Sequence, residues 1–217
     1  MKPKTIVIVG NAKYVDAFDL HKLDGIETIG CNRILLHPYF RPTHLVVCDR
    51  RPYIPELESG RLQKWADKGD ILLSTTLWDP NISCANTPVQ KRPKFRHREF
   101  PLSGSRSKMN WESLKKPFCS CANTGIALFQ FARVLGATRI GVTGIGLVPP
   151  VDLQKGHFYG EDEWGQQPSS NKAFLAAERA RDELKAMGVP VFNLSLEKAE
   201  MENLFGRYDF DKFIRET

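Results

Sequence analysis

The chain contains the run Thr5-Ile6-Val7-Ile8-Val9, which is followed directly by Gly10. A β-branched run of this length is typical of a strand that is buried on both faces, as the strands of parallel sheets are. The glycine that follows permits a tight turn and a close approach of the backbone to a ligand. The run therefore predicts an α/β protein whose helices cover both faces of a sheet.

Five further stretches of the chain have the length and composition of short strands. They are Ile26–Gly30, Leu45–Cys48, Ile71–Ser74, Arg139–Thr143 and Val191–Leu194. Helical periodicity appears between the later strands, over Thr124–Leu135 and over Asn171–Met187. Asn123 is a plausible N-cap for the first of these helices, and Gly136 a plausible stop. Strands that alternate with helices predict a doubly wound, mostly parallel sheet of the Rossmann-like class, with residues 1–217 as a single domain.

The segment 78–117 interrupts this alternation. It is rich in proline, serine, asparagine and basic residues, and it predicts an irregular basic insertion within the domain. Between residues 91 and 116 there are nine lysines or arginines and two glutamates, a net charge of +7, against +6 for the whole chain. Such a segment favours a phosphate-bearing partner, including a nucleic acid bound through residues 91–116, with the interleaved rings of Phe95, Phe100 and Trp111 in the contact surface. The alternative is a solvated basic loop.

The composition sets further limits on the class of protein. Hydrophobic residues make up 41% of the 217 residues and charged residues 26%, as is ordinary for globular domains. No apolar run approaches the roughly 18–20 residues that span a bilayer, and the apolar run near the N-terminus is too short for the core of a signal peptide. We therefore expect a cytoplasmic protein with no membrane span. The five cysteines have no zinc-like spacing, which predicts reduced thiols and no structural metal.

Four of the predicted strands end in polar residues or glycine. The segments are Gly10-Asn11, Cys31-Asn32-Arg33, Asp49-Arg50 and Gly144-Ile145-Gly146. Because the carboxyl ends of parallel strands meet at one edge of the sheet, ligands of open α/β proteins bind there. These segments therefore predict a ligand site at that edge.

Each of these side chains suits a part of a nucleotide. Gly10 allows phosphate to approach the backbone, and Asn32 can read a base or ribose. Asp49 can bind a ribose hydroxyl or a hydrated Mg²⁺, and Arg33 and Arg50 can neutralise a diphosphate. Bland alternatives stay open for three of them: Gly10 as the end of a strand, Asn32 as a helix cap and Asp49 as a loop cap.

Two later segments add candidates, and two absences exclude classes of protein. The turn before Thr124 and Gly125 leads into a predicted helix, whose N-terminal N–H groups can bind an anion. His157 lies between glycines, and imidazole is the side chain best suited to proton transfer near neutral pH. The chain has no G-x-G-x-x-G after its first strand and no Walker A motif, which disfavours NAD-dependent dehydrogenases and P-loop kinases.

These segments together resemble a known group of proteins. Val9-Gly10-Asn11, Gly30-Cys31-Asn32-Arg33 and the stretch from Pro42 to Asp49 resemble the opening of the bacterial sialyltransferases that use a CMP-activated sugar. They are also similar to the archaeal-type 6-hydroxymethylpterin diphosphokinases and related phage proteins. Asn123-Thr124-Gly125 and His157-Phe158-Tyr159-Gly160 look like that group's second half.

The resemblance implies a role for each matching residue. Gly10, Asn11 and Asn32 would contact the nucleotide of the donor, and Thr124 and Gly125 would line its phosphate or sugar. His157 would be the general base, and Tyr159 would assist departure of the nucleotide phosphate. The sequence departs from the group at two places. Lys13-Tyr14 replaces Pro-Ser after the first turn, and Gly144-Ile145-Gly146 lacks the acid of the usual G-x-D.

Three functions fit these observations. The first is a transferase with a nucleotide-activated donor, a glycosyltransferase of the sialyltransferase type that takes a CMP- or NDP-sugar. The second is a pterin-type diphosphokinase that uses ATP and Mg²⁺. The third is a non-catalytic protein that binds a nucleotide or a nucleic acid.

Overall fold

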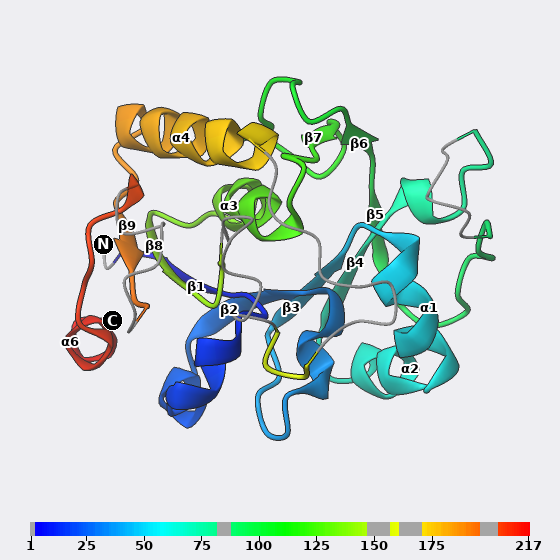
Figure 1. Ribbon diagram of the computed structural model, residues 1–217, viewed down its shortest axis with the longest axis horizontal. Helices are drawn as coiled ribbons and strands as arrows, with labels where there is room; N and C mark the ends of the chain where they lie inside the picture. The colour runs from blue at the N-terminus through cyan, green and yellow to red at the C-terminus, as the bar shows by residue number, and fades with distance from the viewer. Residues whose placement is uncertain (1–2, 82–87, 147–156, 161–170, 196–203) are drawn as a thin grey trace.

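The computed structural model describes residues 3–81, 88–146, 157–160, 171–195 and 204–217 (Figure 1). Its centre is a seven-stranded sheet of strand order β5-β4-β3-β2-β1-β8-β9, in which every neighbouring pair is parallel. The strands are β1 (Thr5–Val9), β2 (Glu27–Cys31), β3 (His44–Val47), β4 (Asp70–Ser74), β5 (Arg98–Phe100), β8 (Arg139–Thr143) and β9 (Val191–Asn193). The prediction of a doubly wound parallel α/β sheet is confirmed.

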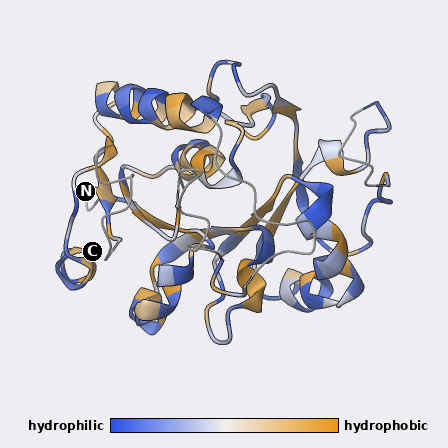
Figure 2. Ribbon diagram, in the orientation of Figure 1, coloured by the Kyte–Doolittle hydropathy of each residue, from blue (hydrophilic) through white to orange (hydrophobic). Residues whose placement is uncertain are grey.

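Helices cover both faces of this sheet. On one face lie α3 (Thr124–Val134) and α4 (Asn171–Ala186), and on the other α1 (Arg50–Glu58), α2 (Arg61–Ala66) and α6 (Phe210–Arg215), as Figure 1 shows. Short 3-10 helices follow three strands: η1 (Lys13–Ala17) and η2 (Leu20–Leu23) after β1, η3 (Asn32–Leu36) after β2 and η4 (Thr75–Leu77) after β4. Figure 2 shows hydrophobic strands beneath helices with hydrophilic outer surfaces.

The alternation of side chains along β1 explains why the sheet is covered twice. Ile6 and Ile8 belong to the core beneath α3 and α4, and Val7 and Val9 to the core on the opposite face. All four are fully buried. A strand with both faces buried reads as a continuous apolar run, which is how the fold is legible in the sequence.

The chain order of the strands reverses between β1 and β8. From β1 the chain continues to β2, β3 and β4 on one side, and β8 and β9 lie on the other side. A crevice outside the carboxyl ends of the strands at such a switch point is where open α/β sheets bind ligands. The fold therefore puts the ends of β1, β2 and β8 at the expected place for a site.

The structure differs from the sequence-based prediction within residues 78–117. This segment is not wholly irregular: Arg98–Phe100 forms β5 at the edge of the main sheet, and β6 (Leu102–Ser103) pairs in parallel with β7 (Phe118–Cys119). These strands are two or three residues long, too short to show an alternating pattern. Between β3 and β4 the sequence predicted no helix, yet α1 forms there with Pro55 inside it. Proline normally breaks a helix interior, which hid this element.

A row of alternating charges crosses the amino ends of five strands. Its members, in spatial order, are Lys4, Glu27, His44, Asp70 and Arg98. The ring of His44 lies between two carboxylates, with Nε2 2.9 Å from Glu27 and Nδ1 3.0 Å from Asp70. Burial raises the pKa of each of these carboxyls, but the hydrogen bonds with His44 and its neighbours outweigh burial and hold both pKa values below their usual range.

His44→Ala is expected to lower the free energy of unfolding by roughly 1.5–3 kcal/mol, because it removes two charge-assisted hydrogen bonds. A carboxyl whose pKa is lowered in the folded state stabilises the fold at pH values above its ordinary pKa, and this stabilisation is lost as the pH falls through the lowered pKa. The free energy of unfolding of wild type, measured in urea, should therefore fall below about pH 4, and that of His44→Ala should fall less. His21→Ala, at an exposed histidine, is the control. Equal losses from the two variants would contradict the assignment.

Candidate active site

The ends of β1 and β8 approach each other as closely as backbones can. Gly10 N–H donates to the Thr143 carbonyl, and Ala12 N–H to the Gly144 carbonyl, both at 2.9 Å. A Cβ on Gly10 would lie 2.2 Å from the Gly144 oxygen. Gly144 itself has a φ of 70°, in the left-handed region. Both glycines are therefore required by the way the two turns cross at the switch point.

Two asparagines with unsatisfied oxygens stand at this edge. Asn11 is buried, and its Nδ2 donates to the Cys31 carbonyl at 3.1 Å, which ties the turn after β1 to the end of β2. Asn32 begins η3 with a φ of 52°, a conformation that asparagine tolerates better than most residues. The Oδ1 atoms of both side chains are buried and have no hydrogen-bond partner among the described residues. Buried amide oxygens without donors are costly, so a ligand that donates there would be favoured.

The turn 157–160 packs directly on the segment after β1. His157 forms an antiparallel bridge with Ala12, and Phe158 N–H donates to the Asn11 carbonyl at 3.0 Å. The rings of His157 and Tyr159 are stacked, with centroids 4.9 Å apart. The structure thus brings His157 and Tyr159, predicted from a remote part of the sequence, beside Gly10 and Asn11.

Arg33 links this turn to α1. Its guanidinium lies over the Tyr159 ring, 5.1 Å from the centroid, and its Nε is 3.3 Å from the carboxylate of Glu56. Glu56 is fully buried and also accepts two hydrogen bonds from Arg61. A guanidinium held by a buried carboxylate is pre-oriented, so Arg33 fixes the position of the tyrosine ring.

His37 is a residue of this region that sequence reasoning missed. Its ring is buried and makes edge contacts with Phe158 at 5.3 Å and Tyr39 at 5.2 Å, and its Nδ1 accepts from the N–H of Phe40. Burial lowers the pKa of His37, more than the nearby Asp16 raises it. The imidazole of His37 is therefore neutral near pH 7 and packs against Phe158 of the turn 157–160. In the sequence only the aromatic run after His37 could have suggested this cluster.

The N-terminus of α3 lies at the same edge. Asn123 caps it as predicted, accepting from the N–H of Ile126 at 3.2 Å. A Cβ on Gly125 would lie 3.0 Å from the side chain of Ile145, so this first turn packs on the segment that follows β8. The eleven-residue helix thus directs the positive end of its dipole, with Thr124 and Gly125, to the neighbourhood of the switch point.

Asp49 and Arg50 are used within the fold. Asp49 caps α1, accepting from the N–H of Arg51 at 2.9 Å, and pairs with the Arg51 guanidinium at 2.6 Å. This matches the alternative interpretation of Asp49 as a cap. Arg50 is 2% exposed and donates to the carbonyls of Thr76, Leu77 and Asp79. The prediction that Arg50 neutralises a diphosphate is wrong, because its guanidinium is buried among backbone acceptors.

The basic segment 91–116 presents charge but not aromatic rings. Six of its basic side chains are exposed and form no ion pair with a described residue: Lys91, Lys94, Arg96, Arg106, Lys108 and Lys115. Phe95 and Phe100 are buried in the cores, and the Trp111 indole donates to Glu183 on α4. The expectation that these three rings form a contact surface with nucleic acid is therefore wrong for the two phenylalanines, which are needed inside the fold.

The described part of the chain contains neither a cluster of metal ligands nor a helix that could span a membrane. Across residues 3–81, 88–146, 157–160, 171–195 and 204–217, no three His, Cys, Asp or Glu side chains are grouped to hold a metal ion. In that same part of the chain no helix has both the length and the apolar character to cross a bilayer. Four described cysteines (Cys31, Cys48, Cys119 and Cys121) have free thiols, and burial raises the pKa of Cys31 to about 12.

Comparison with known proteins places the fold. No family model and no curated protein sequence matches the chain. Among solved structures, the sialyltransferase CST-II in complex with a trisaccharide acceptor and CMP is similar over 94% of this chain and 86% of that chain, with a TM-score of 0.54 and 12% identity. CstII from Campylobacter jejuni in complex with the substrate analogue CMP-3FNeuAc gives a TM-score of 0.55 at 11% identity over the same shares of the two chains. The chain therefore has an α/β fold like that of these sialyltransferases.

Proposed function

We propose that the protein is a glycosyltransferase that takes its sugar from a nucleotide-activated donor, with a CMP-sugar as the donor tested first. The observation that carries this proposal is the pair of buried, unpartnered Oδ1 atoms of Asn11 and Asn32 at the carboxyl ends of β1 and β2. The amide nitrogen of Asn11 is engaged by Cys31, so its oxygen is the atom left to accept from a ligand. Ribose hydroxyls and the exocyclic amine of cytosine are donors of the required kind. The fold shared with CMP-bound sialyltransferases supports the same choice.

The remaining groups at the switch point fit the chemistry of sugar transfer. An acceptor hydroxyl would attack the anomeric carbon, the bond from that carbon to the phosphate oxygen would break, and the hydroxyl proton would pass to the imidazole of His157. Tyr159, stacked on His157 and held by Arg33, would donate a hydrogen bond to the departing phosphate. The N–H groups that begin α3 would stabilise the charge on the nucleotide phosphate.

CMP is expected to raise the melting temperature of the protein without added metal. A ligand present at 100 times its Kd stabilises the folded state by about 2.7 kcal/mol, which for a chain of this size is a shift of roughly 5–10 °C. Asn11→Ala should abolish most of the shift, because it removes the free amide oxygen and the tie to Cys31. Asn81→Ala, at an exposed asparagine outside the site, is the matched control.

The same assay separates this proposal from its competitors. UDP, GDP and ADP test other donor bases, and stabilisation by one of them in place of CMP would change the donor and keep the class of reaction. A shift with ATP and Mg²⁺ alone would contradict sugar transfer and favour diphosphate transfer. No shift with any nucleotide would overturn a nucleotide site at the switch point.

We also propose that the exposed basic side chains of residues 91–116 bind a phosphate-bearing acceptor, with a nucleic acid as the partner tested. These six side chains are exposed and form no ion pair with a described residue, and the rings of Phe95 and Phe100 are buried. A nucleic acid bound here would therefore be held by charge and not by stacking on those two rings. The logarithm of the binding constant for an oligonucleotide should fall linearly with the logarithm of salt concentration. If all six side chains reach phosphates, its slope should be about −4 for single strands and about −5.4 for duplex DNA.

Fluorescence anisotropy with labelled single- and double-stranded oligonucleotides measures this slope. Lys94→Gln with Arg96→Gln should reduce its magnitude by about one to two. Lys64→Gln, an exposed lysine on α2, should leave it unchanged. Absence of binding at low salt would rule out a nucleic acid acceptor without touching the proposal for the donor.

A further inference from the structure

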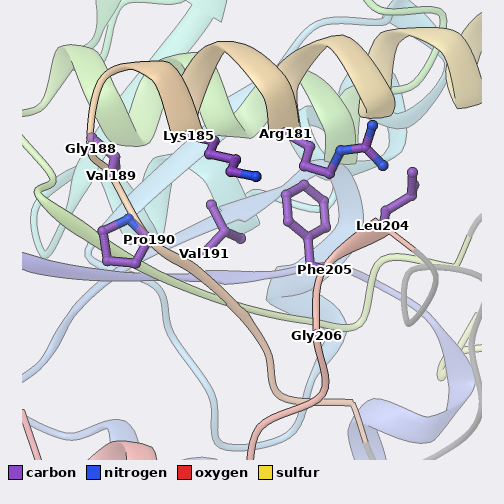
Figure 3. A pocket seen from close by; sticks show the side chains of 9 residues that line it. All are labelled: Arg181, Lys185, Gly188, Val189, Pro190, Val191, Leu204, Phe205 and Gly206. Atoms are coloured by element: carbon purple, nitrogen blue, oxygen red, sulfur yellow. The ribbon is translucent and has the colours of Figure 1, made fainter.

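A cavity lies away from the switch point, between α4 and the amino end of β9. It has a volume of about 510 Å³, within the range of small-molecule sites. The residues that line it come from the second half of α4, from the turn that enters β9 and from the segment Leu204–Gly206 (Figure 3). The candidate active site uses the carboxyl ends of the strands, so the two places are at opposite edges of the sheet.

One wall of this cavity is cationic. Arg181 and Lys185 are four residues apart on α4 and therefore lie on the same side of the helix. Figure 3 shows both side chains on the side of α4 that faces Phe205 and Val191. Arg181 uses its Nε to pair with Asp182 at 2.8 Å, and Lys185 Nζ makes no hydrogen bond or ion pair with a described residue. The wall can therefore offer the Lys185 ammonium and the outer nitrogens of Arg181 to an anion.

The opposite wall is apolar and rigid. Phe205 is 4% exposed, and its ring stacks on Phe129 of α3 at 5.2 Å. Val191 and Leu204 pack beside it on the same core. The backbone behind this wall is also held in place. Asn193 N–H donates to the Gly206 carbonyl at 3.3 Å, and Asn193 forms a parallel β-bridge with Arg207. The part of this wall that a ligand can reach is the half-buried side chains of Val191 and Leu204, with the Phe205 ring packed behind them.

We propose that this cavity binds a small amphipathic anion: an aromatic or otherwise flat apolar group that carries a phosphate or carboxylate. The apolar group would lie against the half-buried side chains of Val191 and Leu204, and the anionic group would pair with Lys185 and the outer nitrogens of Arg181. A purely apolar ligand would make no use of these cations, and a bare anion would leave the Val191 and Leu204 surface in contact with water. The combination of the two walls selects for a molecule with both parts.

Isothermal titration calorimetry with 1-naphthyl phosphate tests this assignment, with inorganic phosphate and 1-naphthol as the two half-ligands. We expect 1-naphthyl phosphate to bind at least about tenfold more tightly than either, since each half contributes separately to affinity. Arg181→Gln with Lys185→Gln should weaken that binding by about tenfold or more. Lys172→Gln, at an exposed lysine of the same helix outside the cavity, should leave it within about twofold.

Several results would overturn the inference. Equal affinity for inorganic phosphate would remove the role of the apolar wall, and equal affinity for 1-naphthol would remove the role of the cations. Binding that survives the double glutamine variant would place the ligand elsewhere. Binding of 1-naphthyl phosphate that is lost in Asn11→Ala would place the ligand at the switch point and would also overturn the inference, whereas unchanged binding in that variant supports a separate site.

Discussion

His157→Ala is expected to lower the rate of sugar transfer by roughly 10²–10⁴-fold, the range that a positioned general base contributes. The imidazole lies on the turn that Phe158 attaches to the Asn11 carbonyl, so the backbone holds it beside the proposed nucleotide site. This hydrogen bond joins backbone atoms of Phe158 and Asn11, so it remains when the imidazole is removed. Binding of CMP, measured by its effect on the melting temperature, should therefore change little in the variant.

The pairing of these two measurements distinguishes catalysis from structure. His21→Ala replaces an exposed histidine of η2 and should keep both the rate and the CMP shift. A variant with an unchanged rate would show that the acceptor proton goes elsewhere, and a variant that loses CMP binding as well would indicate a structural role.

Gly144→Ala is expected to destabilise the protein strongly. The new Cβ would lie 2.3 Å from Val15 Cγ2 and 2.7 Å from the Gly10 carbonyl oxygen, and the residue has a φ of 70°. Backbone on one side and a buried valine on the other leave no room for a local shift. We expect a loss of roughly 3–5 kcal/mol in the free energy of unfolding, as for the severe core lesions.

Gly60 provides a matched control for that prediction. It has nearly the same φ, 72°, but a Cβ there would meet nothing within 4 Å. Gly60→Ala should therefore cost only the left-handed conformation, about 1–2 kcal/mol. Urea unfolding of the two variants measures the difference, which is the contribution of the crossing between β1 and β8. Equal losses would mean that the two turns can separate at no cost.

The strands that could be predicted from the sequence are those whose two faces are both buried. The run Thr5–Val9 became β1 with the predicted bounds, and Arg139–Thr143 became β8 beside it, because strands between two helix layers must be apolar throughout. Asn123 and Gly136 bound α3 as expected, since capping depends on local backbone chemistry alone.

The features that could not be predicted from the sequence depend on contacts between residues far apart in the chain. β5 is three residues long and holds its place through β4 and the pairing of Arg98 with Asp70. Arg50 reads as a surface arginine, but three carbonyls 26 to 29 residues away bury it. The contact of His37 with Phe158 joins two turns that no local pattern connects.

The candidate site falls between these two cases. The rule that parallel strands end at one edge predicted that Gly10, Asn11 and Asn32 lie together, and the geometry agrees. His157 was a candidate from its place between glycines and from the resemblance to sialyltransferases, but its packing on Ala12 joins segments far apart in the sequence and was not predicted. The roles of these side chains stay predictions. The observation that supports them is that the buried amide oxygens of Asn11 and Asn32 have no hydrogen-bond donor among the described residues.

The most direct measurement is the release of CMP from CMP-N-acetylneuraminic acid by the purified protein, followed with wild type and with His157→Ala. The account predicts that wild type releases CMP, faster with a hydroxyl-bearing sugar acceptor than with water alone, and that the variant is slower by at least about 100-fold. Failure of wild type to release CMP, together with no stabilisation by CMP or any nucleoside diphosphate, would contradict sugar transfer from a nucleotide donor at this site.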